Sequence, residues 1–216
     1  ACLPSPYPLD SYDRCRIYCW EIVLSDDERN ENLRQNSRRE EVLTAAAQLF
    51  SRNGYDSTSM RDIASAVGML PGSLYYHFPS KEELFVAIHD AGVEQIYNGV
   101  EQAIKNISAP WERLEAAAVA HLQAILVEES FAAVMTQLYP SRLARVSATL
   151  IDQRNRYEAI YREIIEQLDL TARDKKYLRL SLLGAMNWTL RWYKPTGDSP
   201  EEIGKSFVGL FRNKQD

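Results

Sequence analysis

The sequence predicts an all-α protein, and three observations carry that prediction. Apolar residues recur three and four positions apart through most of the chain, as they do on one face of a helix. No stretch alternates polar and apolar residues between turn signals, as a strand would. Serine, threonine, proline and glycine stand at the points where successive helices would begin and end. We therefore expect a series of short helices followed by longer ones.

Length and composition are those of an ordinary globular protein. The chain has 216 residues, of which 45% are hydrophobic and 25% are charged. These values exclude a fibrous repeat, a disulfide-dense mini-protein and a wholly disordered chain. No window of about 18 apolar residues occurs, so we expect no membrane-spanning helix and no membrane partner. The N-terminus also lacks the apolar core of a secretory signal.

The first 36 residues differ from the rest of the chain. They hold all three cysteines, Cys2, Cys15 and Cys19, a distribution that favours a reduced, cytoplasmic setting over a disulfide framework. No histidine stands near them at metal-site spacing, so we expect no metal and no cofactor. With early prolines and a polar run at their end, residues 1–36 are expected to form an atypical, flexible N-terminal extension that precedes the first regular helix.

The next segment is punctuated by residues that start and stop short helices. The first helix is expected to end at Gly54. A second helix follows Thr58 or Ser59, either of which can cap its N-terminus, and Asp62 stands three residues after Ser59, as in a capping box. Gly68 then ends this helix after about eight residues.

A third short helix opens at Pro71, because proline is tolerated at the first helical position. Its residues Leu74 and Phe78, four positions apart, are expected to anchor one face in the core. A proline directly after Phe78 ends the helix. Ser80 then starts a long helix over 81–106.

Beyond residue 106 the sequence predicts only helices. The expected segments are 110–129, 131–138, 140–168, 172–194 and 199–213. We therefore expect a small domain of short helices over 37–84 and a larger helical domain over 85–216.

The second and third short helices have the spacing of a helix-turn-helix, joined by a turn that contains Gly68. The third helix carries small and polar groups off its apolar face, namely Gly72, Ser73, Tyr75, Tyr76 and His77. Such groups suit phosphates and base edges in a major groove. Residues 37–81 have a net charge of only +1, so DNA binding must rely on geometry and helix N-termini rather than on bulk charge. The alternative is that the tyrosines lie in a core or an interface and that His77 is structural.

A resemblance to the TetR family of bacterial transcriptional regulators is carried by the run FSRNGYDSTSMRDIASAVGMLPGSLYYHFPSKEEL, from Phe50 to Leu84. It implies a homodimer that inserts two recognition helices into successive major grooves of double-stranded operator DNA. The residues expected to contact DNA are Thr58, Ser59, Gly72, Ser73, Tyr75, Tyr76, His77 and Lys81. Leu70 departs from the family pattern, which commonly has serine or threonine there, so a capping hydroxyl is lost.

The last two helices are expected to form the dimer surface. The helix over 172–194 carries a row of residues at helical spacing, namely Leu180, Leu183, Gly184, Asn187, Trp188 and Arg191. The apolar face of the helix over 199–213 consists of Phe207, Leu210 and Phe211. The family resemblance favours a four-helix dimer interface here. Burial of these residues within one subunit is the alternative.

The middle helices are expected to enclose a small-molecule effector, because polar groups on otherwise apolar helices orient ligands in hydrophobic pockets. The candidate residues are His121, Met135, Tyr139, Gln153, Tyr157, Trp188, Arg191 and Trp192. Residues 140–194 carry a net charge of +5 and combine tryptophans with cations, which suits a nucleotide-bearing anion. This region is similar to that of TetR-type regulators that sense acyl-CoA thioesters in lipid, sterol or aromatic-acid catabolism. A neutral lipophilic effector and a structural aromatic cluster are the alternatives.

The predicted function is a ligand-responsive transcriptional regulator, in the first place a repressor that its effector releases from the operator. Release is expected when the effector tilts the long helix that begins at Lys81, so that the two DNA-reading heads no longer fit the operator. An enzyme is not expected, because no nucleophile–base pair, metal cluster or phosphate loop is legible in the sequence. A helical adaptor without DNA binding is the remaining alternative.

Overall fold

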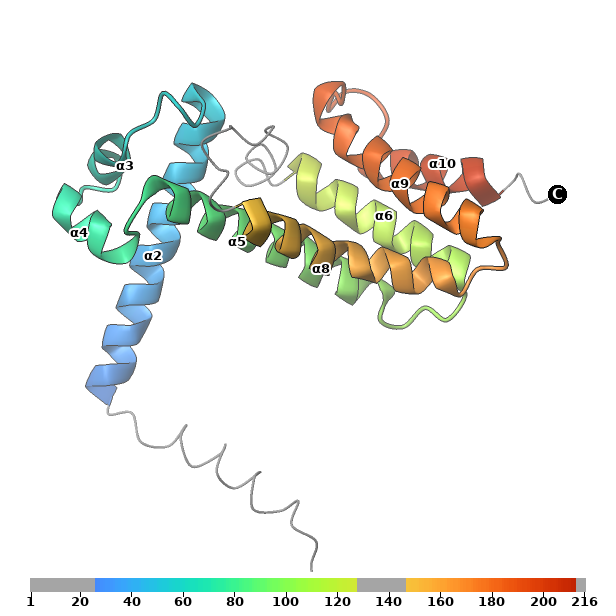
Figure 1. Cartoon of the computed structure of the whole chain (residues 1–216), viewed down its shortest axis with the longest axis horizontal. Helices are drawn as coiled ribbons and strands as arrows, with labels where there is room; N and C mark the ends of the chain where they lie inside the picture. Colours follow the sequence, from blue (N-terminus) through green and yellow to red (C-terminus); the bar gives the residue numbers. More distant parts are fainter. Residues whose placement is uncertain (1–25, 128–146, 213–216) are drawn as a thin grey trace, which may run out of the picture. The chain divides into compact units, whose positions relative to one another are not determined.

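The computed structural model describes residues 26–127 and 147–212, and every regular element in these ranges is a helix (Figure 1). The α-helices are α2 (Asp26–Asn53), α3 (Met60–Ala66), α4 (Pro71–His77), α5 (Lys81–Ile104), α6 (Pro110–Val127), α8 (Ser147–Glu166), α9 (Ala172–Trp188) and α10 (Pro200–Arg212), with a 3-10 turn η2 (Thr189–Arg191) after α9. The predicted all-α class is therefore confirmed.

The chain divides into two compact parts, residues 1–41 and residues 42–216, which we describe separately. In the first part, α2 already begins at Asp26, so the expectation that the polar run up to residue 37 precedes the first helix is wrong. That run holds two glutamates, two arginines and one leucine, which are good helix formers, and acidic residues at its start suit the positive end of a helix dipole. The rest of the predicted extension, residues 1–25, lies outside the described residues.

In the second part, the predicted start and stop signals act where the sequence places them. Ser59 caps α3 in a complete capping box, since its hydroxyl accepts from Asp62 N–H at 3.2 Å while the Asp62 carboxylate accepts from Ser59 N–H at 2.8 Å. Gly68 follows α3 with a φ of +63°, in the left-handed region that favours glycine. Leu70 is the N-cap residue of α4 and gives no side-chain hydrogen bond, as expected from its missing hydroxyl.

The short helices share one hydrophobic core with the first turns of α5. Residues from the end of α2, from α3 and from α4 meet Leu84, Phe85 and Ile88 of α5 there. The ring of Tyr55 lies 5.2 Å from that of Phe50 and 5.3 Å from that of Phe85, centroid to centroid. The amino-terminal end of α5 is therefore an integral part of the helix-turn-helix unit.

The remaining length of α5 packs in a second core with α6, α8, α9 and α10. Helix α6 lies against both α5 and α10, and α8 lies against α5 and α9 (Figure 1). The α6–α10 contact is close at Gly204, where a Cβ atom would stand 3.0 Å from the Val119 backbone nitrogen. Gly184, by contrast, has open space around its Cα on the exposed side of α9.

The helix boundaries agree with the prediction to within a few residues wherever the structure describes them, apart from the start of α2 and the end of α9. The sequence predicts a helix up to residue 194, but α9 ends at Trp188, and Thr189–Arg191 continue as the turn η2. The buried hydroxyl of Thr189 donates to the Met186 carbonyl at 2.6 Å. The predicted helix over 131–138 falls outside the described residues. None of the described helices is long and apolar enough to cross a membrane.

Candidate DNA-binding surface and effector site

Helix α4 is held by two apolar residues and presents polar ones. Leu74 and Phe78 are buried, as predicted. Tyr75 is 48% exposed and Tyr76 is 84% exposed, so neither tyrosine is covered by the chain's own core. The ring of Tyr76 meets that of the half-buried His77 edge to face, with 5.7 Å between centroids. Gly72 and Ser73 are also exposed, in the first turn of α4. Helix α4 is therefore anchored in the core by its apolar residues and exposes a polar and aromatic face to solvent.

Ser59 stands at the exposed start of α3, where the predicted surface includes it. Its hydroxyl donates to the Asp62 carboxylate at 2.7 Å. The hydrogen bonds from the Ser59 side chain and backbone hold the pKa of the Asp62 carboxyl below its ordinary value. The capping box thus fixes the N-terminus of α3 and keeps a carboxylate at its positive end.

Thr58 lies in a different environment from the one predicted. Its side chain is only 1% exposed, and its hydroxyl lies 2.9 Å from the Gly54 carbonyl and 3.3 Å from the Leu49 carbonyl. A hydroxyl that donates inside the turn between α2 and α3 is not presented to a groove. The prediction that Thr58 contacts DNA through its side chain finds no support in this geometry.

Lys81 is half-buried at the start of α5 and points back to the turn before α3. Its ammonium group donates to the carbonyls of Tyr55, at 2.8 Å, and Thr58, at 2.9 Å. It also lies 4.2 Å from the centroid of the Tyr55 ring, a cation–π distance. Two of its three N–H groups are thus engaged, and the lysine joins α5 to the turn between α2 and α3.

Two of the predicted effector residues meet in the core between α6 and α8. Nδ1 of His121 lies 2.6 Å from the Tyr157 hydroxyl, which in turn lies 3.2 Å from the Tyr161 hydroxyl. Tyr161 completes the chain by donating to the Ala117 carbonyl at 3.1 Å. Tyr161 stands four residues after Tyr157 on the same helix face, and the sequence pattern groups it with Gln153 and Tyr157 as polar residues of this helix.

Burial changes the titration of this group. It lowers the pKa of His121 to about 4, an effect that the side chain of Asn187 partly offsets, and it raises the pKa of both Tyr157 and Tyr161. At neutral pH all three side chains are therefore uncharged. Nε2 of His121 has no close hydrogen-bond partner among the described residues, although the Asn187 side chain lies near enough to the imidazole to offset part of the pKa shift.

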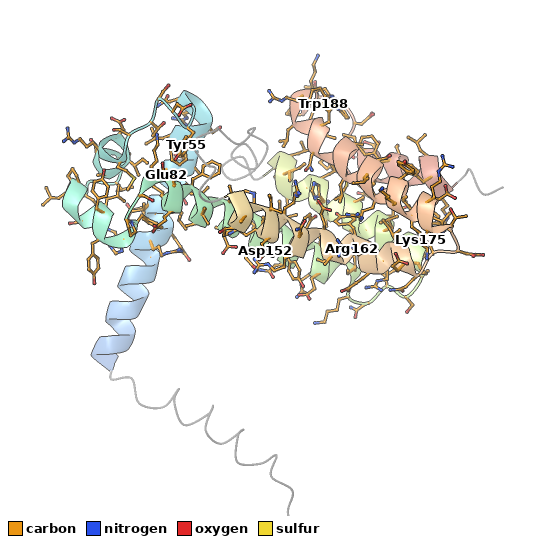
Figure 2. All side chains as sticks on the ribbon, in the orientation of Figure 1. Tyr55, Glu82, Asp152, Arg162, Lys175 and Trp188 are labelled. Carbon is orange, nitrogen blue, oxygen red and sulfur yellow. The ribbon has the colours of Figure 1, made fainter. Side chains whose placement is uncertain are left out.

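The other predicted effector residues are not brought to this group. Gln153 is buried but pairs with His89, with 2.7 Å between Oε1 and Nδ1, and burial lowers the pKa of that histidine. Trp188, Arg191 and Trp192 are exposed, at the end of α9 and just beyond it; Figure 2 shows Trp188 at the opposite end of α9 from Lys175. Met135 and Tyr139 lie outside the described residues.

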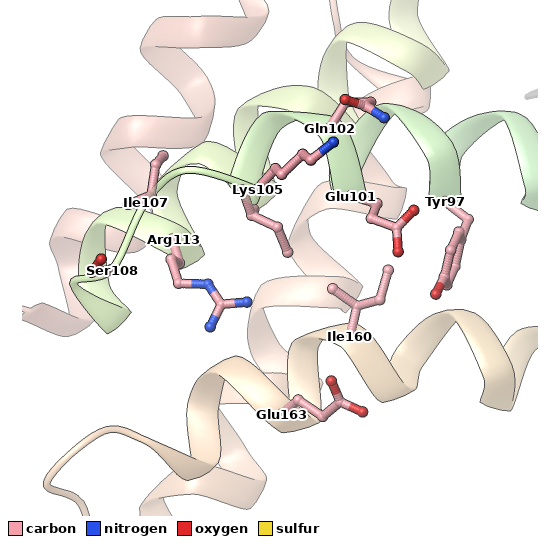
Figure 3. Close-up of a pocket in the computed structure, with 10 residues that line it drawn as sticks. Tyr97, Glu101, Gln102, Lys105, Ile107, Ser108, Arg113, Ile160 and Glu163 are labelled. Carbon is pink, nitrogen blue, oxygen red and sulfur yellow. The ribbon is translucent and has the colours of Figure 1, made fainter. Parts of the chain in front are cut away.

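A pocket of about 680 Å³ opens beside the carboxyl end of α5, and the sequence did not indicate it (Figure 3). Its walls come from α5, from the loop after it, from α6 and from α8, and none of the predicted effector residues lines it. Arg113 reaches into it from α6 and Glu163 borders it on α8. The buried Nε of Arg113 has no hydrogen-bond partner within the described part of the chain. In those same ranges no group of three potential metal ligands occurs.

Two family models match the chain. The model described as "Bacterial regulatory proteins, tetR family" matches residues 42–88, which hold the helix-turn-helix and the first turns of α5. The model described as "Tetracyclin repressor-like, C-terminal domain" matches residues 108–214, which hold the rest of the helical bundle from α6 on.

Named relatives and solved structures agree with these models. The chain is 29% identical over 185 residues to the HTH-type transcriptional repressor KstR2 of Mycolicibacterium smegmatis, covering 81% of this chain and 88% of the relative. KstR2 of Mycobacterium tuberculosis, described as a ketosteroid transcriptional regulator, has a solved structure with a TM-score of 0.65, 25% identity and coverage of 83% and 95%. AibR in complex with isovaleryl coenzyme A and operator DNA gives a TM-score of 0.68, 27% identity and coverage of 80% and 97%.

The family models, the relatives and the exposed polar face of α4 all support the same family assignment. The chain belongs to the TetR family of bacterial transcriptional regulators.

Proposed function

We propose that the protein is a homodimeric repressor that reads double-stranded operator DNA with α4 and leaves it when an acyl-CoA thioester binds. The observation that carries the DNA-reading step is the exposure of Tyr75 and Tyr76 on a helix that Leu74 and Phe78 fix in place. Hydroxyl groups on a rigid helix contact base edges and phosphates without a large net charge. Such a repressor acts in the bacterial cytoplasm, where the chromosome lies.

Contacts to the DNA backbone surround this helix. The N-termini of α3 and α5, capped by Ser59 and Ser80, present backbone N–H groups that suit phosphates. Two N–H groups of the Lys81 ammonium bond to carbonyls, and the third can donate to a DNA phosphate. The main role of Lys81 is therefore to position α5. Thr58 contributes by its buried hydroxyl, which holds the turn before α3 in place.

Dimerisation is supported by an exposed apolar face on the last helices. Tyr177, Leu180 and Trp188 lie on α9 and are between 48% and 64% exposed. Gly184, between Leu180 and Trp188 in the sequence, has open space beside its Cα. Leu210 of α10 is exposed as well. A contiguous apolar face of this kind marks an interface, and a two-fold axis through it would pair α9 and α10 of two subunits.

The acyl-CoA effector is supported by the AibR complex and by two features of this chain. The bundle core between α5, α6 and α8 is lined mostly by apolar side chains, which are the surroundings that an acyl chain needs. Trp188, Arg191 and Trp192 combine aromatic faces with a cation on the surface, which suits an adenine ring and phosphates.

Coupling between effector and DNA runs through α5. This helix contributes to the core of the helix-turn-helix at one end and to the bundle core at the other. The His89–Gln153 hydrogen bond and the ion pairs of Arg156 with Asp90 and Glu94 tie it to α8. A ligand that favours a different α5–α8 arrangement would therefore favour a different placement of α4.

A DNA-binding assay tests the proposal. Fluorescence anisotropy with DNA from upstream of the gene should show salt-sensitive binding, and Tyr76→Ala should weaken it by about tenfold or more, the size of one lost base contact. Lys105→Ala, which removes an exposed cation just beyond the carboxyl end of α5 and far from the helix-turn-helix, is the control and should bind normally. Unchanged affinity of Tyr76→Ala would remove α4 as the reading helix.

Effector titrations use the same complex. Acyl-CoA thioesters should release the DNA, whereas free coenzyme A should not release it at equal concentration. Release by neutral lipophilic compounds, with no effect of any acyl-CoA, would select the neutral effector instead.

A further inference from the structure

The pocket beside the carboxyl end of α5 is lined by charged side chains that do not pair with one another (Figure 3). Arg113 and Lys105 are cationic, and Glu101 and Glu163 are anionic. None of these four groups forms an ion pair with any residue in 37–127 or 147–212. Figure 3 shows the carboxylate of Glu163 directed away from Arg113. The four charges cancel in sum, but each one stands alone at the wall of the pocket.

The guanidinium of Arg113 is the least satisfied of these groups. It reaches into the pocket from the first turn of α6, and its buried Nε has no hydrogen-bond partner in the part of the chain that the structure describes. Nη1 lies 3.5 Å from Oε1 of Gln167, well beyond the roughly 2.7–2.9 Å of a strong charge-assisted bond. A buried donor without an acceptor is unfavourable, so an acceptor is expected to meet Nε–H in the working protein.

A carboxylate fits this guanidinium better than a single oxygen does. Its two oxygens accept two parallel hydrogen bonds, one from Nε–H and one from an Nη–H group. Apolar walls beside the guanidinium suit the hydrocarbon body of an organic acid, since Ile104 of α5 and Ile160 of α8 face the pocket with the ring of Tyr97. The volume of about 680 Å³ falls within the range of about 300–1,000 Å³ that small-molecule pockets have.

The two glutamates limit how much negative charge the pocket accepts. They offset the charges of Arg113 and Lys105, so a single carboxylate leaves the pocket with only one excess negative charge. A phosphate monoester, or the several phosphates of coenzyme A, would add two or more charges beside Glu101 and Glu163 and would be repelled. The pocket is therefore unsuited to the nucleotide part of an acyl-CoA thioester.

We infer that this pocket binds a free, unesterified carboxylic acid with an apolar body, and that Nε and Nη of Arg113 hold its carboxylate. The inference goes beyond the proposed function, because the site takes the acid itself rather than its thioester. It does not depend on the acyl-CoA effector or on operator binding.

Isothermal titration calorimetry on the full-length protein without DNA tests the ligand class. Octanoate and 4-phenylbutanoate offer a carboxylate on an alkyl and on an aryl body, and at least one of them should bind. The corresponding amide should bind about tenfold or more weakly, because it lacks the charge and one of the two acceptor oxygens. Octyl phosphate should also bind more weakly than octanoate. Equal affinity of acid and amide, tighter binding of the phosphate, or no binding of either acid would overturn the inference.

Two substitutions assign the binding to this pocket. Arg113→Lys keeps a positive charge but removes the paired donors, so the acid should bind about tenfold more weakly. Glu163→Gln changes an exposed residue and removes a repelling charge, so the acid should bind several times more tightly while the amide is unaffected. Arg162→Lys, at an exposed arginine of α8 that does not line the pocket, is the control and should bind as the wild type does. Acid binding that neither Arg113→Lys nor Glu163→Gln alters would place the acid elsewhere and overturn the inference.

NMR observes the contact directly. The Nε–H signal of Arg113, assigned by its loss in Arg113→Lys, should shift on addition of the acid and not on addition of the amide. An Nε–H signal that the acid leaves unchanged would contradict the inference. Failure of acyl-CoA thioesters to release DNA would instead refute the proposed effector and leave this site intact.

Discussion

At the scale of single residues, the burial of His121 makes stability depend on pH. Its pKa is about 4 in the folded protein and 6.5 in the unfolded chain, so the unfolded state binds more protons between these values. Stability contributed by the neutral ring is fully present above about pH 6.5 and is lost as the pH falls toward 4. Between a pH above 6.5 and a pH below 4, this one group changes the free energy of unfolding by on the order of 3 kcal/mol.

The measurement is urea denaturation at a series of pH values for the wild type and for His121→Gln, which cannot titrate. Carboxylates also titrate in this window, but they do so in both proteins and cancel in the comparison. The wild type should lose stability relative to the variant from pH 6.5 to 4. Parallel curves would show that His121 is not buried as a neutral ring.

At the scale of elements, Lys81 connects α5 to the turn between α2 and α3. Lys81→Met keeps the length of the side chain but leaves the Tyr55 and Thr58 carbonyls without their donor. We expect the free energy of unfolding to fall by about 1–3 kcal/mol, the cost of unsatisfied buried groups. Thermal or urea denaturation checks this. The matched variant Lys105→Met removes an exposed lysine of the same chain and should change stability by less than about 0.5 kcal/mol.

Operator affinity of these two variants separates a positioning role from a phosphate contact. A folded Lys81→Met protein that binds DNA with a normal salt slope but lower affinity would indicate positioning. A slope reduced by about one would indicate a lost phosphate contact.

The sequence predicts helices well where a local signal sets them. Ser59, Gly68 and Ser80 act through groups within three or four residues, so the bounds of α3, α4 and α5 follow from their own segments. Residues 26–37 were misjudged because a polar run is compatible both with helix and with a mobile extension. Local patterns do not distinguish the two.

The site was less predictable because its contacts join distant segments. Lys81 bonds to carbonyls more than 20 residues away, and Tyr161 reaches Ala117 on another helix. Whether Thr58 faces a groove or its own turn depends on the packing of α2 against α3, which no spacing rule records. The exposure of Tyr76, in contrast, followed from the positions of Leu74 and Phe78 on one short helix.

At the scale of the whole molecule, a single helix belongs to both cores of residues 42–216. Leu84, Phe85 and Ile88 of α5 are buried with the helix-turn-helix, and Val93, Ile96 and Val100 with the bundle. A change in the packing of the bundle can therefore move α4 through α5. In a dimer, such a movement would change the separation of the two α4 helices, and that separation decides whether both fit the operator. The proposed regulation therefore requires the proposed dimer.

That requirement is tested on the exposed face of α9. Leu180 is 48% exposed in the single chain, and Leu180→Glu should place a charge in the proposed interface, where an unpaired charge is strongly unfavourable. We expect analytical ultracentrifugation to show a monomer, and operator affinity to fall by about a hundredfold or more because two half-sites are no longer read together. Ile151→Glu on α8, a similar exposed apolar residue outside this face, should remain dimeric and bind normally. A dimeric Leu180→Glu protein with normal affinity would mean that the subunits pair through another surface, and the route from effector to α4 would then have to be traced from that surface instead.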